Sequence, residues 1–256
     1  FIMSAPAALV DTRESRQLAV RMAPSFAAAI LIALGIRTVA YEPFNIPSGS
    51  MIPTLLIGDY LFVSKFSYGY SRYSLPFSLP LIPGRIFFTE PERGDVMVFK
   101  LPADNSTDYI KRIVGLPGDT VQLRQSILYI NGKPVEREKV DDFIDRSRPN
   151  NYTRTARYME TLPNGRKHYI LEVTDNTIFD NTPVYTVPEG HYFAMGANRD
   201  NSMDSRILAG VGFVPELNLV GRAERLFFSQ DGSARVWQFW KWPSAIRYGR
   251  LFQKII

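Results

Sequence analysis

An uncharged run near the N-terminus constrains this chain more than any other feature. Residues 22–36 read MAPSFAAAILIALGI, and the segment from Met22 to Ala40 contains Arg37 as its single charge. A helix needs about 20 apolar residues to cross the hydrocarbon layer of a bilayer. The segment 22–40 therefore predicts one N-terminal transmembrane helix. A hydrophobic content of 45% is ordinary for a globular protein, so several spans are excluded.

The charges before this run predict its orientation. Arg13, Arg16 and Arg21 precede the apolar segment, and basic residues favour the cytoplasmic side of a membrane helix. Residues 1–21 are thus expected to form a cytoplasmic segment, with the body of the protein on the far side. Two alternatives stay open at this point. The run could be a cleaved signal peptide with processing after residues 38–40, or a buried core helix.

The cysteine and histidine counts restrict the chemistry. The 256 residues include no cysteine and only two histidines, His168 and His191. Disulfides, thiol catalysis and thiolate metal sites are therefore excluded, and a histidine-rich metal site is not expected. The formal net charge of +5 is compatible with nucleic acid or an anionic membrane surface as a partner.

After residue 40 the pattern changes to short strands, which predicts a mostly β body. The dipeptide Asn131-Gly132 indicates a hairpin. Residues 133–182 are polar and are typical of an insertion. We expect strands over 95–100, 109–115, 121–130, 168–171, 183–187 and 191–195. The expected organisation is a catalytic β domain in two parts, 41–125 and 188–230, an inserted β-rich subdomain at 126–187 and a tail at 231–256.

Two segments suggest contact with lipid. The tail, from VWQFWKW onward, mixes tryptophan with lysine and arginine, as membrane-interface segments do. Residues 68–91 are rich in Pro, Phe, Leu and Tyr, which suits a loop resting on the bilayer and a well-packed loop equally. Aromatic and basic residues together also suit single-stranded nucleic acid. Because the predicted anchor places the body outside the cytoplasm, we expect membrane lipid as a partner and no nucleic acid.

The segment FNIPSGSMIPTLLIG, residues 44–58, carries two serines, one glycine and two prolines within seven residues. A turn near the membrane would explain this composition, and so would a serine nucleophile held in an unusual backbone geometry. A serine hydroxyl needs a base, which can be a histidine or a lysine whose pKa is lowered by burial. We expect His191 either to pack in the sheet or to lie exposed on it, and His168 to lie on the surface, which favours lysine.

Lys111 is the lysine that could act as this base. It lies in DYIKRIVGLPGD, residues 108–119, where strand alternation places it on one face with Tyr109 and Ile113. An apolar face would desolvate the amine, although most strand lysines are solvated. A third segment, MGANRDNSMDSR at 195–206, suits either an ordinary polar loop or a catalytic element.

In this order, the three segments resemble the type I signal peptidases of bacteria. YEPF after the apolar run, YINGKPV, VPEGHYF and FVPELNLVGRA are also similar to that family, so the resemblance covers roughly residues 20–230. It implies a membrane-anchored, β-sheet or barrel-like catalytic body in the bacterial inner membrane. The implied activity is a serine endopeptidase that removes signal peptides from preproteins after small residues of the Ala-x-Ala kind, with no cofactor or metal.

The resemblance also implies roles for individual residues. Ser50 matches the nucleophile and Lys111 the general base. The Ser48 hydroxyl and the Ser50 N–H match the oxyanion hole, and Ser202 matches a serine that orients the lysine. Asp204 and Arg206 match a supporting ion pair. The positions that line the substrate pockets in the family are matched by Phe44, Ile46, Leu55, Tyr109 and Ile110.

One departure from the family pattern stands in the third segment. The family usually has Gly-Asp-Asn where this chain has Gly196-Ala197-Asn198, so an acidic side chain is missing at position 197. Other interpretations are a self-cleaving Ser-Lys repressor, which would need a DNA-binding domain in place of the apolar run, a processing peptidase for one substrate, and a non-catalytic anchored scaffold that binds exported chains.

Overall fold

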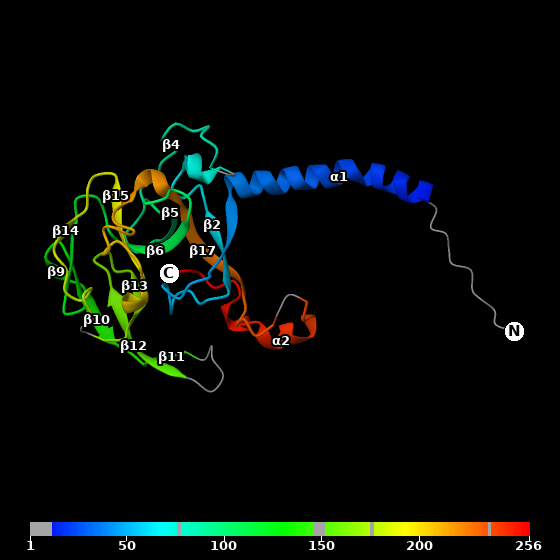
Figure 1. The fold of residues 1–256 in the computed structure, drawn as a ribbon. Helices are drawn as coiled ribbons and strands as arrows, with labels where there is room; N and C mark the ends of the chain where they lie inside the picture. The colour runs from blue at the N-terminus through cyan, green and yellow to red at the C-terminus, as the bar shows by residue number, and fades with distance from the viewer. Residues whose placement is uncertain (1–11, 76–77, 146–151, 175–176, 235–236) are drawn as a thin grey trace.

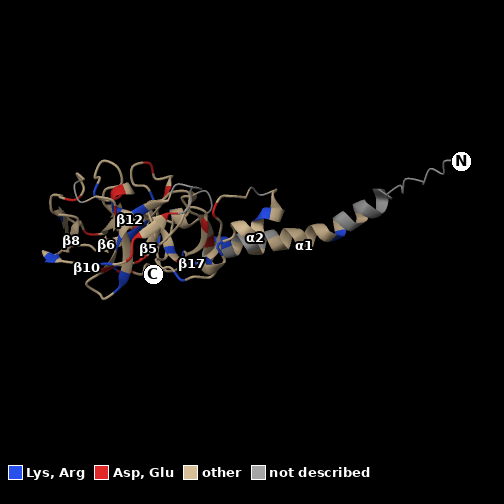
Figure 2. Ribbon diagram, turned by 90° about the horizontal axis from the view of Figure 1, so that it is seen from below, with Lys and Arg blue, Asp and Glu red and all other residues tan. Residues whose placement is uncertain are grey.

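The computed structural model describes residues 12–75, 78–145, 152–174, 177–234 and 237–256. It begins with helix α1 (Thr12–Val39), which Figures 1 and 2 show extending away from a body made mostly of strands. Residues 1–11 of the expected cytoplasmic segment lie outside the described part. Within the described part, no helix combines the length and the apolar character that a membrane crossing requires.

The body is built around one antiparallel sheet of seven strands. The strand order is β1-β2-β17-β5-β6-β15-β16, so strands from both ends of the chain lie side by side. The prediction of a mostly β body is confirmed. The strands are β1 (Tyr41–Asn45), β2 (Asp59–Ser64), β5 (Val96–Lys100), β6 (Asp108–Gly115), β15 (His191–Met195), β16 (Val214–Pro215) and β17 (Leu219–Ser229).

The middle of the chain forms two further sheets that lie together at one end of the body (Figure 1). One has the order β14-β7-β8-β9, and the other has the order β10-β12-β11 with β13 paired to β12. The strands are β7 (Thr120–Arg124), β8 (Ile127–Ile130), β9 (Lys133–Pro134), β10 (Glu136–Lys139), β11 (Phe143–Asp145), β12 (Thr153–Thr161), β13 (Lys167–Glu172) and β14 (Tyr185–Thr186).

The remaining elements are short. Strands β3 (Tyr70–Ser71) and β4 (Arg85–Ile86) pair with each other, and α2 (Trp242–Ala245) lies in the tail on the same side of the body as α1 (Figure 1). The 3-10 helices are η1 (Arg72–Ser74), η3 (Arg199–Asn201), η4 (Glu216–Asn218), η5 (Phe239–Lys241) and η6 (Tyr248–Arg250).

The single strand predicted over residues 121–130 is wrong. The chain turns back there, and β7 pairs with β8 as a hairpin. Gln125 and Ser126 form the turn with φ of +50° and +62°, which is the backbone of a two-residue hairpin turn. Such turns usually carry Asn or Gly, and neither is present, so the sequence offered no signal for it.

The apolar core of the main sheet includes the segment that carries the candidate nucleophile. Ile46, Met51 and Leu55 are buried together with residues of β2, β5 and β17. Burying side chains of this size stabilises a fold by about 1.5–3 kcal/mol each. The turn around Ser50 is therefore fixed to the sheet by its own apolar residues on both sides of the serine.

Candidate active site

Ser50 and Lys111 lie in direct contact at the centre of the site. Ser50 follows β1 in a turn, and Lys111 stands on β6; their exposed fractions are 8% and 3%. Lys111 Nζ lies 2.7 Å from Ser50 Oγ and also donates a hydrogen bond to the Ile110 carbonyl oxygen at 3.0 Å. A serine hydroxyl and an amine at this distance can exchange a proton.

Burial gives Lys111 the protonation behaviour of a base. Desolvation lowers the pKa of Lys111 to about 8, against the opposing influence of the Asp204 carboxylate. The Tyr109 ring lies with its centroid 5.3 Å from Nζ. A substantial fraction of the amine is therefore neutral near pH 8, as a general base requires.

The backbone around Ser50 is closed into a tight loop. Ile46 N–H donates to the Asp59 carbonyl oxygen at 2.9 Å, and Gly58 N–H donates to the Ile46 carbonyl oxygen at 3.0 Å. The Asp59 carboxylate accepts from the Leu56 N–H at 2.8 Å and lies 2.5 Å from Arg250 Nη2. The loop thus enters and leaves the sheet at one point, which limits how far Ser50 can move.

Residues of the third segment brace this loop. Asn198 N–H donates to the Ser50 carbonyl oxygen at 3.0 Å, and Asn198 Nδ2 donates to the Gly49 carbonyl oxygen at 3.1 Å. A Cβ on Gly196 would lie 2.2 Å from Ser202 Oγ and 2.6 Å from the Ser50 carbonyl oxygen. Only glycine fits there, because the two segments pass too closely for any side chain.

Asp204 and Arg206 form a buried ion pair beneath the site. Arg206 Nε lies 2.8 Å from Asp204 Oδ1, and Asp204 Oδ2 accepts from the Gly196 N–H at 3.0 Å. Burial alone would raise the pKa of Asp204, but the Arg206 charge and these hydrogen bonds lower it below its usual range. Arg206 Nη2 also donates to the Arg199 carbonyl oxygen at 2.5 Å, so the pair ties the segment 196–206 together.

Ser202 lies close to the Asp204–Arg206 pair. It makes no hydrogen bond to Lys111, although the resemblance implies one. Its side chain is 8% exposed, and its hydroxyl has no partner at hydrogen-bonding geometry within the described part of the chain. It lies near enough to Asp204 to help lower the pKa of that carboxyl. Its role in orienting Lys111 stays a prediction.

A groove of about 590 Å³ opens over Ser50 and Lys111. Four of the five expected pocket residues line it, namely Phe44, Ile46, Tyr109 and Ile110, and the exposed Ser48 lines it too. Leu55 does not, because it is fully buried in the core. Lining residues that sequence reasoning missed are Asn45, Val98, Asp108, Asn198, Asn201 and Met203.

Comparison with known proteins assigns the family. The family described as signal peptidase, peptidase S26, matches residues 19–228. The chain belongs to this family. It is 44% identical to a signal peptidase I of Rickettsia conorii, over 90% of this chain and 91% of that protein, and 47% identical to one of Rickettsia typhi, over 80% and 78%. A solved signal peptidase I from Enterococcus faecalis covers 52% of this chain and 97% of its own, with 28% identity and a TM-score of 0.31.

The departure from the signal peptidase pattern lies in a buried corner. Ala197 is 2% exposed, and its carbonyl oxygen accepts from the Leu171 N–H of β13 at 2.8 Å. The third segment therefore contacts the middle part of the chain as well as the loop around Ser50.

The expectation that His168 lies on the surface is wrong. It is 5% exposed, and its Nε2 lies 3.2 Å from Glu160 Oε2. Burial and the nearby Arg112 charge lower the pKa of His168 to about 4 despite Glu160, so the ring is neutral near pH 7. Glu160 and His168 face each other across the β12–β13 pair, and a register of this kind cannot be read from a polar sequence. His191 is half-buried on β15.

One acidic cluster among the described residues has a spacing that could suit a metal ion. It consists of Glu172, Asp180 and Asp200, whose ligand atoms lie within 4.8 Å of one another. None of the three lines the groove, and we assign the cluster no part in the chemistry.

Proposed function

We propose that the chain is a membrane-bound serine endopeptidase that removes signal peptides from exported preproteins, with Ser50 as nucleophile and Lys111 as general base. The observation that supports it best is the 2.7 Å contact between Lys111 Nζ and Ser50 Oγ on the wall of a groove wide enough for a peptide. Family membership, through relatives named signal peptidase I, points to the same activity.

Neutral Lys111 takes the Ser50 proton while Ser50 Oγ attacks the carbonyl carbon of the scissile bond. The protonated amine then gives that proton to the leaving nitrogen, and the new N-terminus departs. The same lysine deprotonates a water molecule that hydrolyses the acyl-enzyme ester and restores Ser50. Apart from the substrate and this water molecule, these steps use only groups of the chain itself.

The developing oxyanion would be stabilised by the Ser50 N–H and the Ser48 hydroxyl. Ser48 lines the groove two residues before the nucleophile, which suits such a donor. The loss of one oxyanion donor lowers the rate of acyl transfer by about 10²–10³ in other serine proteases. The carbonyl oxygens of Gly49 and Ser50 are already held by Asn198, which favours a fixed orientation of the intervening N–H.

The groove also suits substrates with small residues just before the cleaved bond. Phe44, Ile46 and Ile110 give it apolar walls. A peptide bound in extended form points alternate side chains the same way, so residues one and three before the cut would meet these walls together. We propose that this limits both positions to small side chains.

We further propose that α1 anchors the protein, with residues 1–21 in the cytoplasm of a bacterial cell and the body on the outer face of the inner membrane. The uncharged residues 22–36 and the exposed side chains of Val20, Met22, Phe26 and Ile32 support this. The exposed aromatic residues of the tail, on the side of the body from which α1 extends, support contact with lipid: Trp237, Phe239, Trp240 and Trp242. The division into two catalytic parts around residues 126–187 remains part of this proposal.

The test is cleavage of a preprotein by the detergent-solubilised protein, followed by sequencing of the new N-terminus. We expect one cut after an Ala-x-Ala-type site and no cut with Ser50→Ala. A scaffold would bind the preprotein without cutting it. A peptidase dedicated to one substrate would leave a panel of unrelated preproteins intact.

A further inference from the structure

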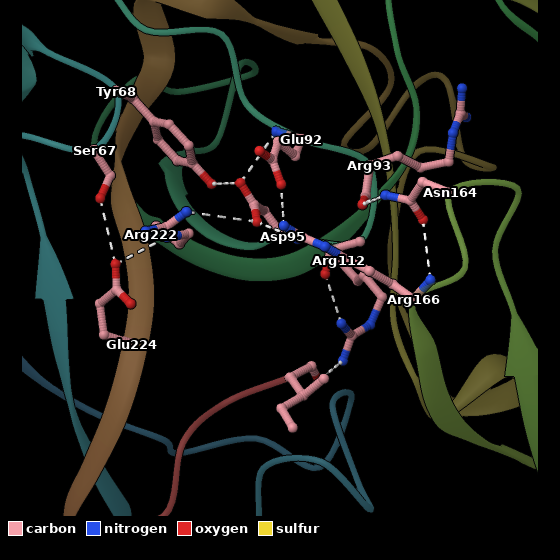
Figure 3. Close-up of polar contacts among 12 residues, drawn as sticks. Ser67, Tyr68, Glu92, Arg93, Asp95, Arg112, Asn164, Arg166, Arg222 and Glu224 are labelled. Atoms are coloured by element: carbon pink, nitrogen blue, oxygen red, sulfur yellow. Dashed lines mark hydrogen bonds and ion pairs between the residues drawn. The ribbon is translucent and has the colours of Figure 1, made fainter.

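Two buried arginines lie close enough to influence each other near the position where this chain departs from the signal peptidase pattern. Arg112 on β6 and Arg199 on η3 are 2% and 1% exposed. Arg112 donates to the Gly94 and Ile256 backbone oxygens, each at 2.7 Å (Figure 3). Buried guanidinium groups without an opposite charge are costly, so the corner needs a carboxylate.

Position 197 would be a direct place for that carboxylate. Met195 on β15 is the register partner of Arg112 on β6, and residue 197 follows Met195 by two. Residue 197 lies beyond the end of β15 and precedes Arg199 by two residues, so a carboxylate there would be close to both arginines in the chain or in register. The family pattern has its acid at this position, whereas Ala197 carries no charge.

A carboxylate reaches the corner from another part of the chain instead. Glu160 on β12 is 1% exposed, and its Oε2 lies 2.5 Å from Arg199 Nη2 and 3.2 Å from His168 Nε2. Burial alone would raise its pKa, but Arg199 and His168 lower it to about 2, so it is ionised near pH 7. Burial lowers the pKa of Arg112 to about 10, and the Glu160 charge is the largest influence in the opposite direction.

Glu160 is connected to the catalytic groups through the third segment. The Arg199 side chain pairs with Glu160, and the Arg199 carbonyl oxygen accepts a hydrogen bond from Arg206. Arg206 pairs with Asp204, and the preceding Asn198 fixes the backbone of the nucleophile loop. A shift of Arg199 would therefore move both supports of the Ser50–Lys111 pair.

We propose that Glu160 supplies the buried negative charge that the family pattern places at position 197, and that the inserted subdomain is thereby a positioning element of the active site. The inference rests on the proposed function. Glu160 does not line the groove, so it acts through Arg199 on the third segment and makes no contact with substrate.

The experiment is a double-mutant cycle of Glu160→Gln and Ala197→Asp, read by preprotein cleavage and by thermal unfolding. We expect Glu160→Gln to lower kcat at least tenfold with KM within about twofold. Ala197→Asp alone should also lower kcat, because a second carboxylate would then share the corner. The double variant, which moves the charge from 160 to 197, should recover at least fivefold over Glu160→Gln.

Glu172→Gln is the control for replacing a buried acid by its amide. Glu172 lies in the same subdomain, is 2% exposed, and its Oε1 lies 3.9 Å from Arg137 Nη1. Burial raises the pKa of Glu172 to about 8, so this change removes little negative charge near pH 7. Adding Ala197→Asp to this variant should give no recovery. A role for Glu160 in folding alone would lower the melting temperature and kcat together, and Ala197→Asp would restore neither.

Full activity of Glu160→Gln, or a loss that Ala197→Asp does not repair, would overturn the inference. If the unmodified protein cleaves no preprotein, the proposed function fails separately, and the melting temperatures still decide. Recovery of the Glu160→Gln melting temperature by Ala197→Asp would then support the charge exchange, and its absence would refute it.

Discussion

Two lysines of this molecule are almost equally buried and have opposite surroundings. Lys65, just after β2, is 2% exposed; its Nζ lies 2.9 Å from Glu42 Oε2 and donates to the Ser74 carbonyl oxygen at 2.5 Å. Lys111 on β6 is 3% exposed and contacts a hydroxyl and a carbonyl. No carboxylate of the described residues lies within ion-pairing distance of it.

The difference shows that burial does not by itself make a lysine a base. Burial alone would raise the pKa of Glu42, but hydrogen bonds from Lys65 and Arg37 lower it, so this carboxylate stays charged beside Lys65. An opposite charge in contact with an amine favours its charged form. Lys111 has no carboxylate in contact, so desolvation outweighs the opposing Asp204 charge and lowers its pKa to about 8.

The largest expected effect is the loss of cleavage when Lys111 or Ser50 is replaced. Lys111→Ala and Ser50→Ala should each lower single-turnover cleavage of a preprotein by about 10⁴-fold or more. The double variant should lose little beyond either single one, because the two groups act as a unit. Near-normal turnover in Lys111→Ala would place the base elsewhere.

The next effect is on the pH profile. As the proposed base, Lys111 would be active only when neutral, and the neutral fraction falls about tenfold per pH unit below its pKa of about 8. Cleavage at pH 6 should therefore be roughly 100-fold slower than on the alkaline plateau when kcat/KM is measured across pH 5.5–9.5. A rate that stays flat over this range, with chemistry limiting, would rule out a lysine base.

A smaller effect is expected on the side of Lys65. Glu42→Gln would leave a buried ammonium without its opposite charge, which destabilises proteins by about 3–5 kcal/mol when both partners are fully buried. Glu42 is partly exposed and also faces Arg37, so we expect about 1–3 kcal/mol of lost unfolding free energy in urea titrations. Unchanged stability would show that water already solvates Lys65.

The smallest effect is expected on the cleavage rate when Lys65 is replaced. Lys65→Met removes the charge but keeps a long side chain, and cleavage below the melting temperature should stay within about threefold of the unmodified protein. Lys111→Met, with the identical replacement, should be inactive. If both variants lost activity alike, a buried lysine would matter here for reasons other than its position beside Ser50.

Sequence reasoning placed Ser50 and Lys111 in one site because each lies in a short segment that resembles a family motif, and such a signal is local. The structure brings their side chains into contact. Sequence reasoning misplaced Leu55 because an apolar side chain in this loop suits the core and the groove equally well. Glu160 was not singled out, and His168 was wrongly expected on the surface. Their contact depends on the register of β12 against β13, and no local pattern fixes a register between polar strands.

The join between α1 and β1 sets a length scale. The helix ends at Val39, β1 begins at Tyr41, and Phe44 already lines the groove. Four extended residues beyond Ala40 span about 13 Å. With α1 as the anchor, this length would fix the distance between the membrane surface and Ser50. A preprotein whose cleavage site lies closer than this to its own membrane helix could not reach Ser50. A much longer spacer would place the cleavage site beyond Ser50.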